Sequence, residues 1–330
     1  MDRTDLKSRL IDCHNHIGVS IKAYARLEYP YAQSLEALFY KQRSAGVDVS
    51  VVFPLTSDLF FNLRTLISRG INLPDRKPVS EIPYGVENTL IMHEIFRFNP
   101  EHAGSFIPFV SADTERKVGS QVKFLESLEK KYPVYGIKIN PTVSQSKIGS
   151  LLRKGEALLK YARERNIPFL FHTSPSPDDY YSYVGDALKV VEKNPDIRFA
   201  LAHCIVFHKG YLEIADSLPN VWVDTAALKI QVDLFNREKF AEKYVPIGAD
   251  FSDHKKVMRK LMELYPDTII WGSDSPAYSY ICRRKQTRDR YMDFNYRGSY
   301  EDEKNGLDSL PEDLKRKASN TNTLDWLFGS

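Results

Sequence analysis

Short apolar runs alternate with longer amphipathic segments along most of the chain. Near-continuous β-branched and aromatic runs, such as residues 49–55 (VSVVFPL), are typical of strands covered on both faces, as in a parallel sheet. Apolar residues at helical spacing separate many of these runs, for example over 34–44, 118–131 and 184–193. The pattern predicts strands at 10–16, 49–55, 106–110, 134–140, 168–173, 197–204, 220–225 and 267–272.

This alternation predicts an α/β fold, a (β/α)8 TIM-type barrel, with an open doubly wound sheet as the alternative. No shift in composition marks a linker, so residues 1–330 are expected to form a single domain. Two stretches depart from the regular alternation. A long insertion after the second strand, residues 56–104, is expected to form part of the rim above the site, and a long basic, tyrosine-rich loop follows the eighth strand from residue 278.

Charge and cysteine content exclude several classes of protein. The net charge is +3, from 46 basic and 43 acidic residues, which is too weak a field to indicate a nucleic-acid partner. No apolar run approaches the length of a membrane span, and the charged N-terminal sequence MDRTDLKSRL contains no apolar signal region. Three scattered cysteines indicate reduced thiols. We therefore expect a cytoplasmic protein without a membrane or nucleic-acid partner.

The first predicted strand ends in the sequence His-Asn-His. Strand side chains alternate with a period of two, so His14 and His16 should share one face with Asp12, while Cys13 and Asn15 should point the other way. Two imidazoles on one face can coordinate the same metal ion as a pair of ligands. The alternative is that both are simply polar residues at the end of a strand.

Further titratable residues stand at the C-terminal ends of later strands. The active sites of TIM barrels are built at these ends, so the side chains are expected to meet at one rim of the barrel. A single histidine in such a place is commonly a hydrogen-bonded core residue, but the set as a whole favours a site. Its members beyond the first strand are Lys138, His172, His203 and Asp274.

Imidazole and carboxylate ligands together suit Zn²⁺ or another divalent ion, and a catalytic site leaves one position open for water. The candidate ligands are His14, His16, His172 and Asp274. A metal ion lowers the pKa of bound water from about 15.7 towards 7, which supplies a nucleophile at neutral pH. His203 is either a ligand of a second ion or an acid–base group, and the sequence leaves both roles open.

Five segments, IDCHNHIG, YGIKINP, FLFHTS, LAHC and WGSDSP, occur in this order at the predicted strand ends. Together they resemble the amidohydrolase superfamily, and specifically its amidohydrolase-related (amidohydrolase 2) branch of metal-dependent hydrolases and decarboxylases. The resemblance covers residues 10 to 328. It implies that His14 and His16 bind a buried metal, that His172 is a further ligand, and that Asp274 binds metal and carries the proton of the attacking water.

The resemblance also leaves the number of metal ions, one or two, open. Where members of the superfamily hold two, a carbamylated lysine on the fourth strand bridges them, and the histidines corresponding to His172 and His203 bind the second ion. Lys138 occupies the place of that lysine. The alternative, which we favour, is that Lys138 is a cation that binds a substrate carboxylate or pairs with an aspartate.

The basic segment after the eighth strand contains Arg283 and Arg284, which could clamp an anionic substrate, although a solvated loop is the simpler interpretation. The leading hypothesis is a metal-dependent hydrolase that attacks the carbonyl of a small, carboxylate-bearing ester, lactone or amide. Non-oxidative decarboxylation at the same site is the alternative, and a catalytically inactive binding barrel is a third reading. The expected partners are a small-molecule substrate and, in a homodimer, a second copy of the chain.

Overall fold

The structure is a computed structural model that describes residues 1–176, 178–237, 244–285 and 291–329, without the side chains of residues 284, 285 and 291. Parallel barrel strands lie at all eight predicted places, and the third is divided in two. The strands are β1 (Ile11–Val19), β3 (Val49–Pro54), β4 (Phe106–Pro108) with β5 (Val110–Ala112), β6 (Ile137–Ile139), β7 (Phe169–Phe171), β8 (Phe199–Leu201), β9 (Val221–Asp224) and β10 (Ile269–Ile270). The short β2 (Ala32–Gln33) pairs antiparallel with the end of β1.

Backbone hydrogen bonds close these strands into a barrel. Strands β5 to β10 pair in sequence order, and β3 lies between β1 and β4. The first and last strands meet along a seam, where the N–H of Cys13 donates to the carbonyl of Trp271 at 3.0 Å and the N–H of Asp274 donates to the carbonyl of His14 at 2.9 Å. The predicted barrel is therefore confirmed, and the open-sheet alternative is wrong.

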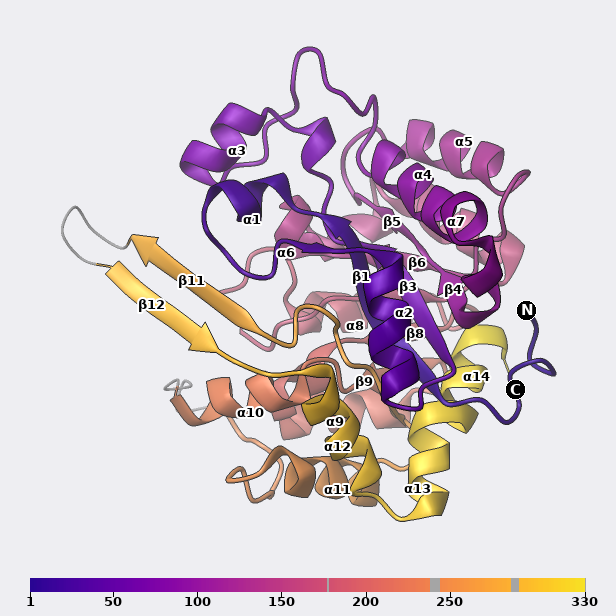
Figure 1. Cartoon of the computed structure of the whole chain (residues 1–330), viewed down its shortest axis with the longest axis vertical. Helices are drawn as coiled ribbons and strands as arrows, with labels where there is room; N and C mark the ends of the chain where they lie inside the picture. The colour runs from indigo at the N-terminus through magenta and orange to yellow at the C-terminus, as the bar shows by residue number, and fades with distance from the viewer. Residues whose placement is uncertain (177, 238–243, 286–290, 330) are drawn as a thin grey trace.

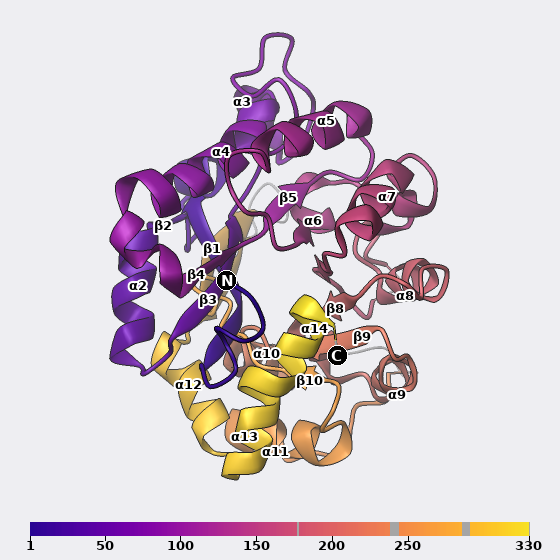
Figure 2. The same cartoon turned by 90° about the vertical axis from the view of Figure 1, so that its right-hand side faces the viewer.

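A ring of helices surrounds the barrel (Figure 2). Alternation along each strand divides the core into two layers, because Ile137 and Ile139 pack outwards towards the helices while Lys138 between them points inwards. The main helices are α2 (Leu35–Ser44), α4 (Gly85–His93), α5 (Val118–Leu128), α7 (Glu156–Arg165), α8 (Val184–Glu192), α9 (Lys209–Ser217), α10 (Leu228–Arg237), α11 (His254–Leu264) and α12 (Tyr300–Asp308). No helix in the described ranges has the length and apolar character that crossing a membrane requires.

The C-terminal helix α14 (Asn322–Phe328) covers the N-terminal end of the barrel, where both chain termini also lie (Figure 2). Trp326 is fully buried in the inner core layer, and its indole N–H donates to the carbonyl of Phe169 at the start of β7 at 3.2 Å. This face is thereby closed by apolar side chains, and the opposite face is left for a site.

The segment after β10 differs from the expected loop. It forms an antiparallel hairpin of β11 (Tyr280–Lys285) and β12 (Tyr291–Tyr296), which projects from the barrel (Figure 1). Polar and aromatic residues alternate in β12 over residues 293–296, and such alternation is typical of a half-buried strand. The segment 56–104 contains the short helix α3 (Leu63–Arg69) and the helix α4, which packs against β1 and β3.

The first strand also departs from strict alternation. Its pairing with β3 shifts by one residue between Asp12 and Asn15, which is a β-bulge. One extra residue exchanges the two faces of a strand. Cys13 therefore packs in the inner core layer, whereas Asp12 accepts a hydrogen bond from the hydroxyl of Tyr300 on α12 at 2.8 Å. The predicted orientations of Asp12 and Cys13 are wrong, although His14 and His16 do converge.

Candidate metal centre

Three buried side chains converge at the seam of the barrel. The Nε2 atoms of His14 and His16 lie 3.4 and 3.2 Å from Oδ1 of Asp274. One donor atom from each residue lies within 4.8 Å of the others, and no second group of this kind is found among the described residues. His14 and His16 come from β1 and Asp274 follows β10, so the group spans the two sides of the seam.

The chemistry of this group fits a divalent cation. Oδ1 of Asp274 is buried and has no hydrogen-bond partner in the described part of the chain, which is a costly state for a carboxylate oxygen. Burial raises the pKa of Asp274, but the imidazoles of His14, His16 and His203 in their protonated forms, through their charge and a hydrogen bond from His16, outweigh it and lower the pKa to about 2. The residue is therefore a carboxylate at neutral pH, and a cation between it and the two imidazoles would satisfy all three.

Neighbouring acceptors orient both imidazoles towards this point. Nδ1 of His14 lies 2.7 Å from Oδ2 of Asp224, and because a carboxylate only accepts, Nδ1 carries the hydrogen and Nε2 keeps its lone pair. Nδ1 of His16 faces the carbonyl of Pro54 at 3.5 Å in the same way. Burial lowers the pKa of both histidines, that of His14 well below its usual range, so both are neutral ligands at pH 7. Such outer partners fix the tautomer of metal-binding histidines.

The sequence analysis did not single out Asp224. Its carboxylate also accepts hydrogen bonds from the backbone N–H groups of His203 at 3.0 Å and Ala226 at 3.0 Å. It therefore connects His14 on β1 to the segment that follows β8. A signal was present in the sequence, because Asp224 is the next-to-last residue of the predicted seventh strand and so lies at the same end of its strand as the other site residues.

Lys138 lies beside the donor group, as predicted. Its Nζ is 3.1 Å from Nε2 of His14 and 4.8 Å from the centre of the Phe53 ring. Burial lowers the pKa of Lys138 to about 8, so a substantial part of the amine is neutral near pH 8. A neutral amine is the form that reacts with CO₂, and an ammonium is the form that binds a carboxylate, so both predicted roles are available to it.

His172 and His203 form a separate pair. Nδ1 of His172 lies 2.8 Å from Nε2 of His203, and Nδ1 of His203 lies 3.1 Å from the carbonyl of Ala226. A carbonyl only accepts, so in the neutral pair Nδ1 of His203 carries a hydrogen and its Nε2 accepts from His172. The pair touches the donor group through Oδ2 of Asp274, which is 3.9 Å from Nδ1 of His203. The structure thus places His172 next to the three-residue group and not within it.

The backbone around His203 is strained. Five consecutive residues, from His203 to Phe207, have positive φ angles of 65°, 50°, 48°, 45° and 68°. Left-handed backbone costs roughly 1–2 kcal/mol for each residue other than glycine. All five side chains are buried, so packing and the hydrogen bond to Asp224 hold this conformation. Strain of this kind is concentrated at functional sites.

A cavity of about 290 Å³ opens above these residues at the C-terminal end of the barrel. His16, His172, His203 and Asp274 form its floor, Asn140 and Gln231 add polar groups, and α10 and the hairpin supply the remaining wall. Arg283, a predicted substrate-binding residue, is not on this wall; it is exposed on the hairpin, 3.3 Å from Asp293. The side chain of Arg284 lies outside the described residues.

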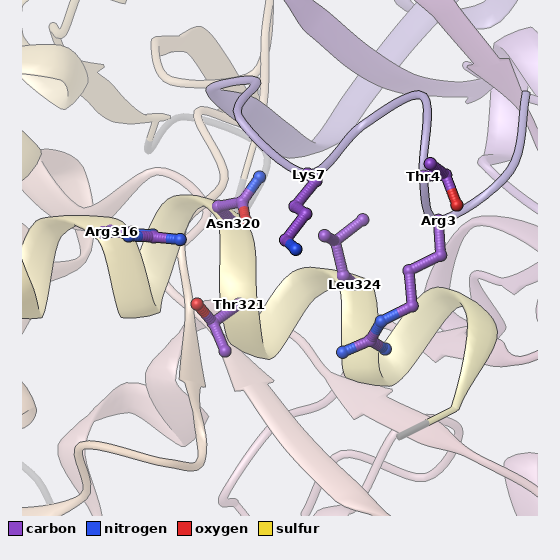
Figure 3. A pocket seen from close by; sticks show the side chains of 7 residues that line it. All are labelled: Arg3, Thr4, Lys7, Arg316, Asn320, Thr321 and Leu324. Atoms are coloured by element: carbon purple, nitrogen blue, oxygen red, sulfur yellow. The ribbon is translucent and has the colours of Figure 1, made fainter.

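A second cavity, of about 330 Å³, lies at the opposite face (Figure 3). It is formed between the N-terminal segment and the C-terminal helices. No histidine or carboxylate lines its described wall, so it offers no donor set for a metal ion. The lining residues are Arg3, Thr4, Lys7, Arg316, Asn320, Thr321 and Leu324.

The closed barrel and the buried His/His/Asp group define a TIM barrel with a candidate metal site. Residues 95–328 match the family model described as Amidohydrolase (Amidohydro_2). The chain therefore belongs to the amidohydrolase 2 family of the amidohydrolase superfamily, as the sequence motifs predict. The matched range contains Lys138, His172, His203 and Asp274 and begins after the strand that bears His14 and His16. No curated protein matches the chain in sequence.

Solved structures share the fold at low sequence identity. A TIM-barrel protein from Bordetella bronchiseptica has a TM-score of 0.59 at 13% identity, with 96% of this chain and 98% of that chain covered. An amidohydrolase from Burkholderia multivorans with bound HEPES also has a TM-score of 0.59, at 10% identity, with 97% and 99% covered. IDCase from Metarhizium anisopliae has a TM-score of 0.53 at 12% identity, with 99% and 98% covered. At these identities the likeness establishes the barrel alone.

Proposed function

We propose that the chain is a metal-dependent hydrolase that acts on the carbonyl group of a small ester, lactone or amide. His14, His16 and Asp274 would hold a divalent ion, most plausibly Zn²⁺ given two imidazoles and one carboxylate. When bound, such an ion polarises a carbonyl and makes a water molecule nucleophilic at neutral pH. The observation that carries the proposal is the buried Oδ1 of Asp274, which lacks a hydrogen-bond partner in the described structure and faces two imidazole nitrogens.

In this proposal Asp274 also moves a proton. Its pKa of about 2 keeps it ionised, so its carboxylate is ready to accept the proton of the attacking water and to return it to the leaving group. Its Oδ2 lies 3.9 Å from Nδ1 of His203, which supports a proton path beside the histidine pair. Asp274 lines the cavity, as a residue in this role must.

The His172–His203 pair would position the attacking water or a substrate hydroxyl. Both residues line the cavity, and their shared hydrogen bond leaves Nε2 of His172 available. Burial lowers the pKa of His172 well below its usual range, so His172 stays neutral at pH 7 and its Nε2 keeps a lone pair that accepts a hydrogen bond from this water or hydroxyl. The pair would thus supply a polar group without a second ion.

Elemental analysis of protein purified without chelator tests the proposal. One ion per chain is expected if Lys138 is a cation, and two ions are expected if Lys138 is a carbamate that bridges them. The Asp274→Asn variant should then lose activity on any ester or lactone that the protein hydrolyses. A protein that remains metal-free after incubation with Zn²⁺, Mn²⁺ and Fe²⁺ would overturn the proposal.

Non-oxidative decarboxylation is the second candidate. The observation that favours it is the position of His203 on the cavity floor beside Asp274, from which it could protonate a carbon atom as CO₂ leaves. Release of CO₂ from an aromatic carboxylate, measured by a coupled assay, would favour this reaction. Consumption of water without release of CO₂ would favour hydrolysis.

A further inference from the structure

The wall of the active-site cavity that faces the metal donors is apolar. Helix α10 contributes two aliphatic side chains, the hairpin contributes three aromatic side chains, and one alanine lies between them. These residues are Ile230, Leu234, Ala277, Tyr280, Phe294 and Tyr296. No lysine or arginine of the described residues lines this cavity. Lys138 lies below it against His14, and the guanidinium of Arg237 lies 5.0 Å from the centre of the Tyr296 ring.

The pairing of the hairpin strands explains why its aromatic side faces inwards. Tyr280 is opposite Tyr296 and Cys282 is opposite Phe294, so these four side chains share one face. Arg283 pairs with Asp293 on the other face, where both side chains are 68% exposed. The hairpin therefore turns its charged pair to solvent and its rings to the cavity.

Backbone hydrogen bonds fix the hairpin in this position. The N–H of Tyr29 donates to the carbonyl of Ile281 at 2.8 Å, and the N–H of Ile281 donates to the carbonyl of Tyr29 at 2.9 Å. At the base, the hydroxyl of Ser279 donates to the carbonyl of Gly298 at 2.7 Å. A side chain at position 298 would collide with the carbonyl of Tyr278, so the glycine permits this close approach. The aromatic wall is held at both points.

From this wall we infer that the substrate carries an uncharged, apolar body, such as an aryl or alicyclic ring, next to the bond that reacts. The inference rests on the proposed function, which places the reacting bond at His14, His16 and Asp274. A ring on this wall loses contact with water and stacks on aromatic side chains, both of which favour binding. A carboxylate in the same place would lose its hydration without a cation to balance its charge, because no lysine or arginine of the described residues lines the cavity. The inference replaces the carboxylate-bearing substrate of the leading hypothesis from the sequence.

A matched pair of hydroxamates tests the inference by binding alone. Benzohydroxamic acid and succinic acid monohydroxamate share one metal-binding group and are similar in size, but one presents a phenyl ring and the other a carboxylate. Calorimetric titration of the metal-loaded protein should show that the phenyl probe binds at least tenfold more tightly. Equal binding, or tighter binding of the carboxylate probe, would overturn the inference.

A cation placed on the wall should change this preference. In the Leu234→Lys variant the affinity ratio of the two probes should move at least tenfold towards the carboxylate probe. Leu264→Lys is the matched control, because Leu264 is 41% exposed on α11 and does not line the cavity. An unchanged ratio in Leu234→Lys would count against the apolar wall as the determinant of specificity.

Metal content of the same samples distinguishes a failure of this inference from a failure of the proposed function. If the metal-loaded protein shows no preference for the phenyl probe, the inference of an apolar substrate body is wrong and the proposed function still stands. If the protein prefers the phenyl probe but hydrolyses no aryl ester or lactone, the inference of an apolar substrate body stands and the proposed hydrolase function is wrong.

Discussion

The two ends of the barrel contain cavities of similar size, about 290 Å³ at the C-terminal end and about 330 Å³ at the N-terminal end. They differ in how their polar side chains are held. At the C-terminal end His14, His16 and Asp274 are buried, and both imidazoles are oriented by a neighbouring acceptor. At the N-terminal end Lys7 is exposed. Between these two cavities, volume favours the N-terminal one, whereas buried and oriented donor atoms favour the C-terminal one.

The N-terminal cavity has a structural explanation. The guanidinium of Arg3 donates to Asp325 at 2.5 Å and to the carbonyl of Gly329, so it ties the two ends of the chain together. Lysine and arginine side chains offer no lone pair to a metal ion at neutral pH. Residues on this face of a TIM barrel commonly serve stability, while residues on the opposite face serve catalysis.

The largest difference between the two ends should appear on removal of a metal donor. Asp274→Asn is expected to lower metal affinity more than 100-fold, beyond the 10–100-fold typical of outer partners, because it removes the one anionic donor of the group. Competition with a fluorescent chelator measures the affinity. Lys7→Ala, which alters the other cavity, is the control and should leave the affinity unchanged. Full metal affinity in Asp274→Asn would mean that Asp274 is not a ligand.

Asp224→Asn should have the next largest effect. The substitution leaves the site without the carboxylate that orients Nδ1 of His14, and loss of such a partner typically lowers metal affinity 10–100-fold. Asp293→Asn, an exposed aspartate on the hairpin, is the matched control. An affinity equal to that of the unmodified protein would show that His14 keeps its orientation without Asp224.

The pH dependence of metal binding gives a smaller and distinct signal. Burial lowers the pKa of His14 and His16, so both imidazoles stay neutral as the pH falls to 6.5, and protons should not yet compete with the metal. Two histidines of ordinary pKa would lose roughly threefold in affinity between pH 7.5 and 6.5. Chelator competition at both values should therefore show almost no change. A threefold loss would indicate that the imidazoles are not shielded in solution.

The smallest effect is expected at the N-terminal end. Arg3→Ala removes a partly exposed ion pair and a hydrogen bond, and it should lower the free energy of unfolding by about 1 kcal/mol without changing metal affinity. Denaturant unfolding, followed by circular dichroism, measures the change. A loss of metal binding in this variant would contradict the separation of roles between the two ends.

Periodicity in the sequence predicts the barrel and the rim on which His14, His16, Lys138 and Asp274 meet. It succeeds because parallel strands of a closed barrel bring their C-terminal ends together, so the end of each strand is informative by itself. The same reasoning fails within β1, where the bulge between Asp12 and Asn15 reverses the faces of Asp12 and Cys13. A bulge depends on pairing with the neighbouring strand, which local alternation does not reveal.

The remaining differences come from contacts between distant segments. Asp224 and His14 meet only because β1 and β9 close around one interior, so no local pattern assigns the carboxylate to the imidazole. The charge of Arg283 alone allows either a substrate clamp or the simpler solvated loop. Once Tyr280, Cys282 and Phe294 are seen to share one face of a hairpin, Arg283 must lie on the other.

The seam that closes the barrel has a consequence for the folding of the chain. His14 and His16 belong to the first strand and Asp274 follows the last, so an ion held by all three would link the two ends of the barrel as a reversible cross-link. A link of this kind restricts the unfolded chain as a long-range disulfide does, and binding to the folded state alone raises stability further as the metal concentration rises. Loss of the ion should therefore destabilise the pairing of β1 with β10 first. Metal depletion would then open the barrel at this seam.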